Sequence, residues 1–253
     1  METSAPNRSA AGRWLLLVLS VGVGVVFWDS KVLYPLKLLV VMMHESGHAL
    51  ATLLLGGKVE RVTLALDQSG ACLSAYPPGF FGAAFVYSAG YLGSLIAGMM
   101  LILLSVRFNL ARAVTWTLAG WLALMGVLYA GSPFTLVFCF GTAAVLALCA
   151  KLAPSRALAF GNLFIAAFSA LYAVFDIRDD LWDSRVRGQS DAGLLAQLTH
   201  VPAPVWAGLW TVTALVLLAF FLRLSLRGKQ PASPRRPAQL AISGRAKSIN
   251  ARQ

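Results

Sequence analysis

The segment His44-Glu45-Ser46-Gly47-His48 carries the side chains of this sequence that are best placed to do chemistry. Two histidines four positions apart lie on the same face of an α-helix, one turn from each other, so their imidazoles can bind one zinc ion. A glutamate directly after the first histidine can reach a zinc-bound water and act as its general base. The spacing therefore predicts a Zn²⁺ site for metal-assisted hydrolysis, with His44 and His48 as ligands and Glu45 as the base.

The composition places this motif in a membrane protein. Of the 253 residues, 58% are hydrophobic and 12% are charged, whereas a soluble domain carries roughly 25% charged residues. The high apolar content excludes a disordered chain, and three cysteines without a CxxC spacing exclude a small disulfide scaffold. We interpret the cysteines as reduced packing residues.

Seven apolar runs follow one another, each bounded by charged, glycine- or proline-containing breaks. A membrane-spanning helix needs about 20 apolar residues. The sequence predicts an all-α polytopic membrane protein of about seven transmembrane helices, formed by residues 14–222 between an N-terminal tail (1–13) and a basic, disordered C-terminal tail (223–253). The runs are Trp14–Trp28, Leu33–Leu55, Phe80–Val106, Ala113–Tyr129, Phe134–Ala150, Ala157–Phe175 and Val205–Leu222.

A β-hairpin is predicted over residues 58–76, directly after the second run. Two alternating stretches, Val59–Leu66 and Ala71–Tyr76, are separated by the turn-rich residues 67–70. In a helical membrane protein such a backbone is satisfied only at the interface or against other protein. One hypothesis is that the edge of the hairpin binds an extended substrate strand by β-augmentation. The alternative is a lid that seals the site.

The membrane setting strengthens the zinc interpretation of the motif. Each ionisable side chain within a membrane helix costs about 2.5–3.5 kcal/mol on insertion scales. Three such groups in five residues need a partner, and a divalent cation supplies one. The alternative, two core histidines and an unrelated glutamate, leaves this cost uncompensated.

A catalytic zinc site normally has three protein ligands, so the two histidines need a third. Asp176, at the end of the sixth run, is the predicted ligand, because the second and sixth spans run in the same direction and their ends meet the same membrane face. The sixth helix must then continue through Asp180. Asp179 and Asp180 are alternative ligands, and all three can instead be solvated residues at a helix end. We interpret His200 as a solvated loop residue.

Two further polar residues are assigned other roles. In the polar loop 176–204, Ser190-Asp191 is predicted to cap a short helix, Ala192–Leu198, and we interpret Asp191 as a capping residue. Asn162 lies 14 residues before Asp176, which is about 21 Å along a helix. Asn162 is therefore too distant to stabilise an oxyanion at a site that contains Asp176.

The segment from His44 to Ala49 resembles the zinc-binding motif of the site-2 protease family of intramembrane metallopeptidases. The glycines 56–57 and the predicted hairpin follow the motif as they do in this family. Residues 88–93 and residues 176–180 resemble its small stand-alone branch without a PDZ domain. The resemblance implies that two histidines and an Asp on a later helix bind zinc, and that the Glu activates water. The Asn-Pro…Leu-Asp-Gly segment of the family is absent, so the assignment of Asp176 follows from helix direction and sequence context.

These observations predict a zinc-dependent intramembrane endopeptidase that cleaves membrane-embedded or membrane-proximal proteins, in a multi-pass protein of the bacterial plasma membrane. Its expected partners are a membrane protein substrate and the lipid bilayer. The net charge of +11 lies largely in loops and in the tail, which favours contact with anionic lipid over nucleic acid. The alternative is a proteolytically inactive scaffold that retains the fold. A zinc carrier is disfavoured because no repeat is visible.

Overall fold

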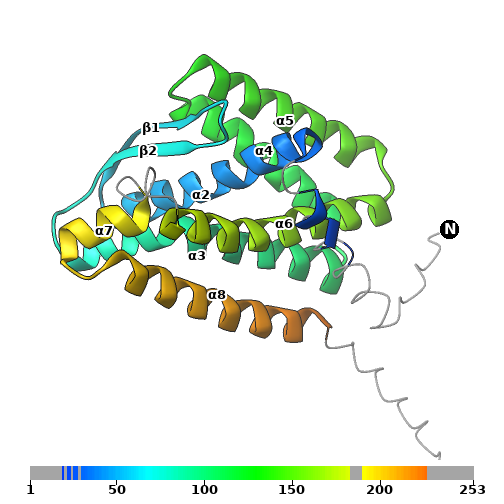
Figure 1. Ribbon diagram of the computed structural model, residues 1–253. Coiled ribbons are helices and arrows are strands. Elements are labelled where there is room, and N and C mark those ends of the chain that lie inside the picture. The colour runs from blue at the N-terminus through cyan, green and yellow to red at the C-terminus, as the bar shows by residue number, and fades with distance from the viewer. Residues whose placement is uncertain (1–18, 20–21, 24, 28–29, 183–189, 227–253) are drawn as a thin grey trace, which may run out of the picture.

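A computed structural model describes residues 30–182 and 190–226, together with residues 19, 22–23 and 25–27. The side chains of 173–182 and of several positions from 218 onward are outside this description. Figure 1 shows a largely helical protein with one β-hairpin. The first predicted span, Trp14–Trp28, lies mostly outside the described residues. Of the predicted disordered tail, 223–253, only residues 223–226 are described, and they are helical, as the end of α8 (Ala203–Leu226).

Each of the other six predicted runs forms a helix. Four helical segments of the described chain are long and apolar enough to cross a membrane, namely residues 80–107, 111–129, 133–152 and 155–172. The predicted total of seven spans stays a prediction. The helices are α2 (Tyr34–Leu54), α3 (Phe80–Ile102), α4 (Ala111–Tyr129), α5 (Pro133–Leu152), α6 (Ser155–Trp182) and α8 (Ala203–Leu226), with the 3-10 turn η1 (Lys31–Leu33) before α2 and the π-helical turn η2 (Leu103–Arg107) after α3.

The predicted hairpin is present directly after α2. Gly56 ends the helix in a left-handed conformation, with φ of +74°, which glycine adopts at little cost. Strand β1 (Lys58–Leu64) then pairs with β2 (Gly70–Ala75) in antiparallel register. The turn between α4 and α5 covers the outer edge of β1, where the N–H of Gly131 donates to the Val62 carbonyl at 2.8 Å. The strand β2 therefore forms the edge of the sheet that faces α2.

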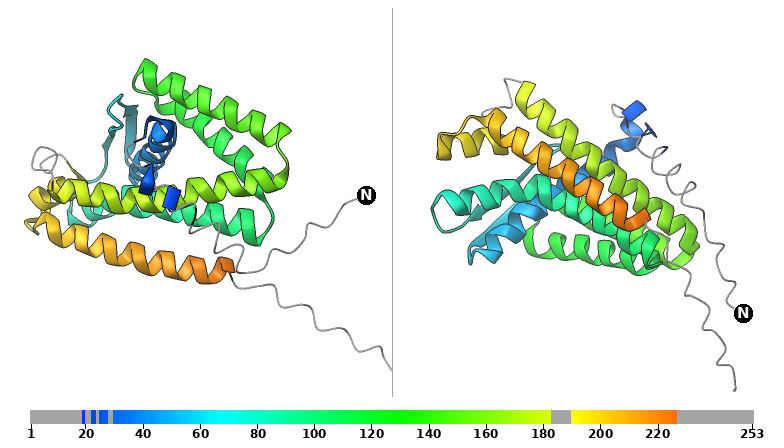
Figure 2. Two further views of the ribbon diagram at one scale, coloured as in Figure 1. Left: turned by 45° about the vertical axis from the view of Figure 1, so that its right-hand side comes forward. Right: turned by 90° about the horizontal axis from the view of Figure 1, so that it is seen from below.

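Helix α3 is the central element of the bundle and packs against α2, α6 and α8. Small residues allow these close contacts. A Cβ added at Gly47 would overlap the Ala89 carbonyl, so α2 and α3 approach backbone to backbone. The Ser169 hydroxyl of α6 donates to the Ser94 carbonyl of α3 at 2.9 Å. Figure 2 shows α4 and α5 on one side of the molecule and α8 on the other, with α3 and α6 between them.

The predicted short helix of the polar loop is confirmed as α7 (Asp191–Thr199). Ser190 caps it, since its hydroxyl accepts a hydrogen bond from the N–H of Gly193 at 3.2 Å. An aromatic cluster, formed by Trp206 and Trp210 of α8, packs α7 against α3 and α8. The indole N–H of Trp206 donates to Thr199 at 3.2 Å, and that of Trp210 donates to Ser88 at 2.8 Å. The short helix is therefore attached to the bundle although it is too short to span a membrane.

Candidate metal centre

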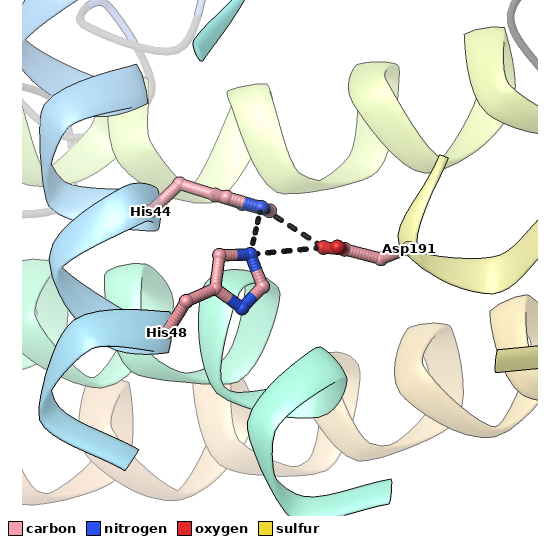
Figure 3. A group of neighbouring side chains, drawn as sticks. All are labelled: His44, His48 and Asp191. Carbon is pink, nitrogen blue, oxygen red and sulfur yellow. Dashed lines mark hydrogen bonds and ion pairs between the residues drawn. The ribbon is translucent and has the colours of Figure 1, made fainter. Parts of the chain in front are cut away.

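Three side chains from two helices converge at one point. His44 and His48 project from the same face of α2, and Asp191 approaches them from the first residue of α7 (Figure 3). The two Nε2 atoms are 3.0 Å apart. Oδ2 of Asp191 lies 3.0 Å from Nε2 of His44 and 3.2 Å from Nε2 of His48. The two histidines thus lie together on one face of α2, as their spacing predicts, and a carboxylate lies within hydrogen-bond distance of both.

The three converging atoms, two imidazole nitrogens and a carboxylate oxygen, are of types that bind divalent metals. Nδ1 of His48 lies 2.8 Å from the Val86 carbonyl, which can only accept, so Nδ1 carries a hydrogen, and in the neutral ring Nε2 is then the atom with the lone pair. Ligands at about 2.0–2.2 Å from a tetrahedral zinc stand roughly 3.3–3.6 Å apart. The observed 3.0–3.2 Å is slightly shorter. Lone pairs this close repel one another unless a cation or a proton lies between them.

The space beside these atoms depends on a glycine of α3. A Cβ added at Gly90 would collide with the Nε2 atoms of both histidines. Tyr91 packs edge-on against His44, with ring centroids 4.7 Å apart. Within the described part of the chain, Nδ1 of His44 is buried without a hydrogen-bond partner. The residues present therefore fit a bound divalent metal: three converging ligands, and a backbone that leaves their metal-facing side open.

Glu45 lies beside the three candidate ligands and is as buried as the two histidines, with 6% of its surface exposed, whereas Asp191 is half-buried. Its carboxylate packs closely against β2. A Cβ added at Gly70 of that strand would lie only 2.7 Å from Oε1. The predicted base is therefore next to the predicted ligands. Burial alone would raise the pKa of Asp191, but the neighbouring His48 and His44 hold the pKa of this carboxyl below its usual range.

Asp191 was assigned only a capping role by its sequence, and this interpretation is incomplete. Asp191 begins α7, as expected, but its carboxylate contacts both histidines. One signal could have found it. By the argument from helix direction, the whole loop after the sixth span lies at the same membrane face as the end of α2. That loop contains Asp191 as well as Asp176.

The other predicted site residues have different outcomes. Helix α6 does continue through Asp180, as a ligand at Asp176 requires, but the side chains of Asp176, Asp179 and Asp180 lie outside the described side chains. Their assignment stays a prediction. His200 ends α7 in a left-handed conformation, exposed as expected. Asn162 is buried elsewhere and bonds to Ser105 and to the Ala111 carbonyl.

Comparison with known sequences adds one finding. The family model described as Peptidase M50B-like matches residues 16–221, most of the chain. No curated protein and no solved structure matches. The matched range contains both histidines, Glu45, the hairpin and Asp191.

Proposed function

Because the chain belongs to the Peptidase M50B-like family of site-2 protease-type metallopeptidases, we propose that it is a zinc-dependent intramembrane endopeptidase. It hydrolyses peptide bonds of membrane-embedded or membrane-proximal proteins. The observation that carries the proposal is the convergence of His44, His48 and Asp191 beside the buried carboxylate of Glu45. The family gives the class of reaction, and the geometry gives this chain the groups to perform it.

Asp191 is the third zinc ligand in this proposal. Its Oδ2 is within 3.2 Å of both Nε2 atoms, and it supplies the negative charge that a site with two neutral imidazoles lacks. The aromatic cluster holds α7 in place, so the carboxylate needs little reorganisation to bind a metal. Asp176 remains the competing candidate, and a direct comparison of the two aspartates separates them.

Each protein group has a defined task in hydrolysis. When bound, zinc polarises the scissile carbonyl and lowers the pKa of water toward about 7. Glu45 takes a proton from the attacking water and passes it to the leaving amine. The Val86 carbonyl fixes the tautomer and the orientation of His48. The surrounding α2, α3 and α7 keep the site buried, which strengthens every electrostatic interaction within it.

The substrate must reach this site as an extended segment. A helical substrate hides its peptide bonds, so it has to unwind before Glu45 can act on a bound water. The four apolar helices long enough for a bilayer support a multi-pass protein, and we assign it to the bacterial plasma membrane. The lipid bilayer and a single-span membrane protein are the partners that this arrangement fits.

The test is zinc content and turnover of the detergent-purified protein on a panel of single-span substrates. The unaltered protein should contain about one zinc per chain and cleave at least one substrate. Glu45→Gln should keep the zinc and lose activity by about 10²–10⁴-fold, the usual contribution of a general base. A protein that holds zinc but cleaves nothing would favour the inactive scaffold, and one that binds no zinc would refute the proposal.

A further inference from the structure

Strand β2 lies against α2 at the position of Glu45. Alternate residues of β2 are half-buried, beginning with Gly70 and Cys72, while the residues between them are exposed. A Cβ added at Gly70 would lie 2.7 Å from Oε1 and 2.9 Å from Cγ of Glu45. The carboxylate therefore packs directly on the backbone of the strand, in a space that any other residue would fill.

The main-chain groups of Cys72 point out of the sheet. Cys72 is paired with Val62 of β1, and pairs in an antiparallel ladder alternate between exchanging hydrogen bonds and exchanging none. The Val62 carbonyl accepts from Gly131 instead of from β2, so this pair exchanges none. The N–H of Cys72 is thus directed to the outer edge of β2, where it makes a hydrogen bond to Glu45.

We propose that β2 positions the general base: the N–H of Cys72 holds the Glu45 carboxylate, and the missing side chain at Gly70 sets how closely it approaches. The inference rests on the proposed function, in which Glu45 is that base. A carboxylate fixed at two points keeps one orientation relative to His44 and His48. The hairpin is then a positioning element for Glu45. A substrate strand could pair with this edge only beyond the position that Glu45 occupies.

The thiol of Cys72 has no part in this role. Burial is the largest cause that raises its pKa, to about 12, so it stays neutral near pH 7. Cys72→Ala keeps the main-chain N–H and removes only the thiol, which makes it the matched control.

The decisive variant is Cys72→Pro, which removes the N–H. Proline is tolerated on an edge strand where the N–H does not take part in the ladder, so β2 should still pair with β1. We expect kcat to fall by about 10- to 100-fold, the loss typical of a hydrogen bond to a charged group. KM and zinc content should match those of Cys72→Ala. Equal kcat for the two variants, with zinc retained, would overturn the inference.

A second measurement does not depend on catalysis. Hydrogen exchange of the Cys72 amide should accelerate by about tenfold in Glu45→Ala, because the acceptor is lost, and remain near the unaltered rate in Glu45→Gln, which keeps an acceptor oxygen. Unchanged exchange in Glu45→Ala would refute the contact. If exchange responds but no protein cleaves substrate, the contact stands and the proposed activity fails. If the unaltered protein cleaves and Cys72→Pro is unimpaired, the activity stands and the positioning role fails.

Discussion

Two clusters of polar side chains are buried in this apolar bundle, and they differ in how their hydrogen bonds are satisfied. The Asn162 cluster comprises Asn162, Ser105, Thr115 and the main-chain carbonyl of Ala111. Asn162 donates to Ser105 at 3.0 Å and to the Ala111 carbonyl at 3.1 Å, and its own carbonyl accepts from Thr115 at 3.2 Å. Donors and acceptors are matched there, so the cluster is complete without a ligand.

The candidate metal centre is different. His44, His48 and Asp191 bring two imidazole nitrogens and a carboxylate oxygen, all atoms able to bind a metal, together within 3.2 Å, and Gly90 keeps a side chain away from them. Both clusters are buried to a similar degree, with Asn162 2% exposed and His44 7% exposed. Burial alone therefore does not identify a functional site. The convergence of three potential metal ligands at one point distinguishes the candidate site, and each prediction below changes one of the two clusters or the packing around it.

The largest effect is expected from Asp191→Asn, compared with Asp176→Asn. Asparagine keeps the size of the ligand but removes its negative charge. Zinc affinity should fall by more than about 100-fold, beyond the 10- to 100-fold typical of outer-shell changes, and turnover should fall with it. Asp176→Asn should retain both. Competition with a zinc chelator measures the affinity.

The reverse result for this pair would restore Asp176 as the ligand. In that case Asp176→Asn would lose its zinc and Asp191→Asn would keep it. The contact of Asp191 with the histidines would then be an ion pair formed without metal, and the comparison of the two clusters would lose its basis.

The second prediction concerns the space beside the ligands. Gly90→Ala adds a methyl group that collides with both Nε2 atoms, so zinc affinity should fall by roughly 10- to 100-fold, as for other changes around the ligands. Gly93→Ala is the matched control, one turn further along α3, where the Cβ would lie 3.4 Å from Cα of Gly47, an ordinary contact. Equal zinc content in the two variants would show that Gly90 serves only helix packing.

The third prediction tests the Asn162 cluster. Asn162→Leu has similar volume and removes three hydrogen bonds, leaving Ser105 and Thr115 without this partner. The free energy of unfolding should fall by about 1–3 kcal/mol, measured by denaturant titration in detergent, while zinc content and kcat stay within about twofold. Thr117→Val is the control, since Thr117 lies on α4 with Thr115 but makes its hydrogen bond, to the Ala113 carbonyl, on an exposed face of that helix. A loss of zinc in Asn162→Leu would make this cluster part of the site.

Much of the fold could be predicted because the patterns that encode it are local. Apolar runs and their breaks located α2 to α6 and α8 within a few residues, since each helix boundary depends on neighbouring charges, prolines or glycines. The glycines at 56–57 and the turn residues 67–70 likewise marked the hairpin. The end of α6 was less apparent, because its last turns carry the charged residues Asp176, Arg178 and Asp179, and a helical segment rich in charges gives no apolar signal.

The site, too, could be predicted only for those residues that are close to one another in the sequence. His44, Glu45 and His48 lie on one helix, so their spacing alone places them together. Asp191 comes from a different segment, and its contact with the histidines depends on how α7 packs on α3 and α8 through the aromatic cluster. No spacing within residues 176–204 encodes that packing. The direction of the Cys72 N–H, away from β1, likewise depends on the strand register and on the turn between α4 and α5 that covers β1.

The smallest expected effect tests whether the packing of α8 on α3 reaches the candidate metal centre. Trp210 of α8 donates to Ser88 of α3 at 2.8 Å and packs against Tyr91, which in turn packs against His44. Trp210→Phe keeps an aromatic ring and loses one neutral hydrogen bond, worth about 0.5–1.5 kcal/mol. If this contact helps to place His44, zinc affinity should fall by about two- to tenfold. Trp116→Phe, on an exposed face of α4, should leave it unchanged. An unchanged affinity in Trp210→Phe would mean that α2 and Asp191 are placed independently of α8, and the metal centre would then be as self-contained as the Asn162 cluster.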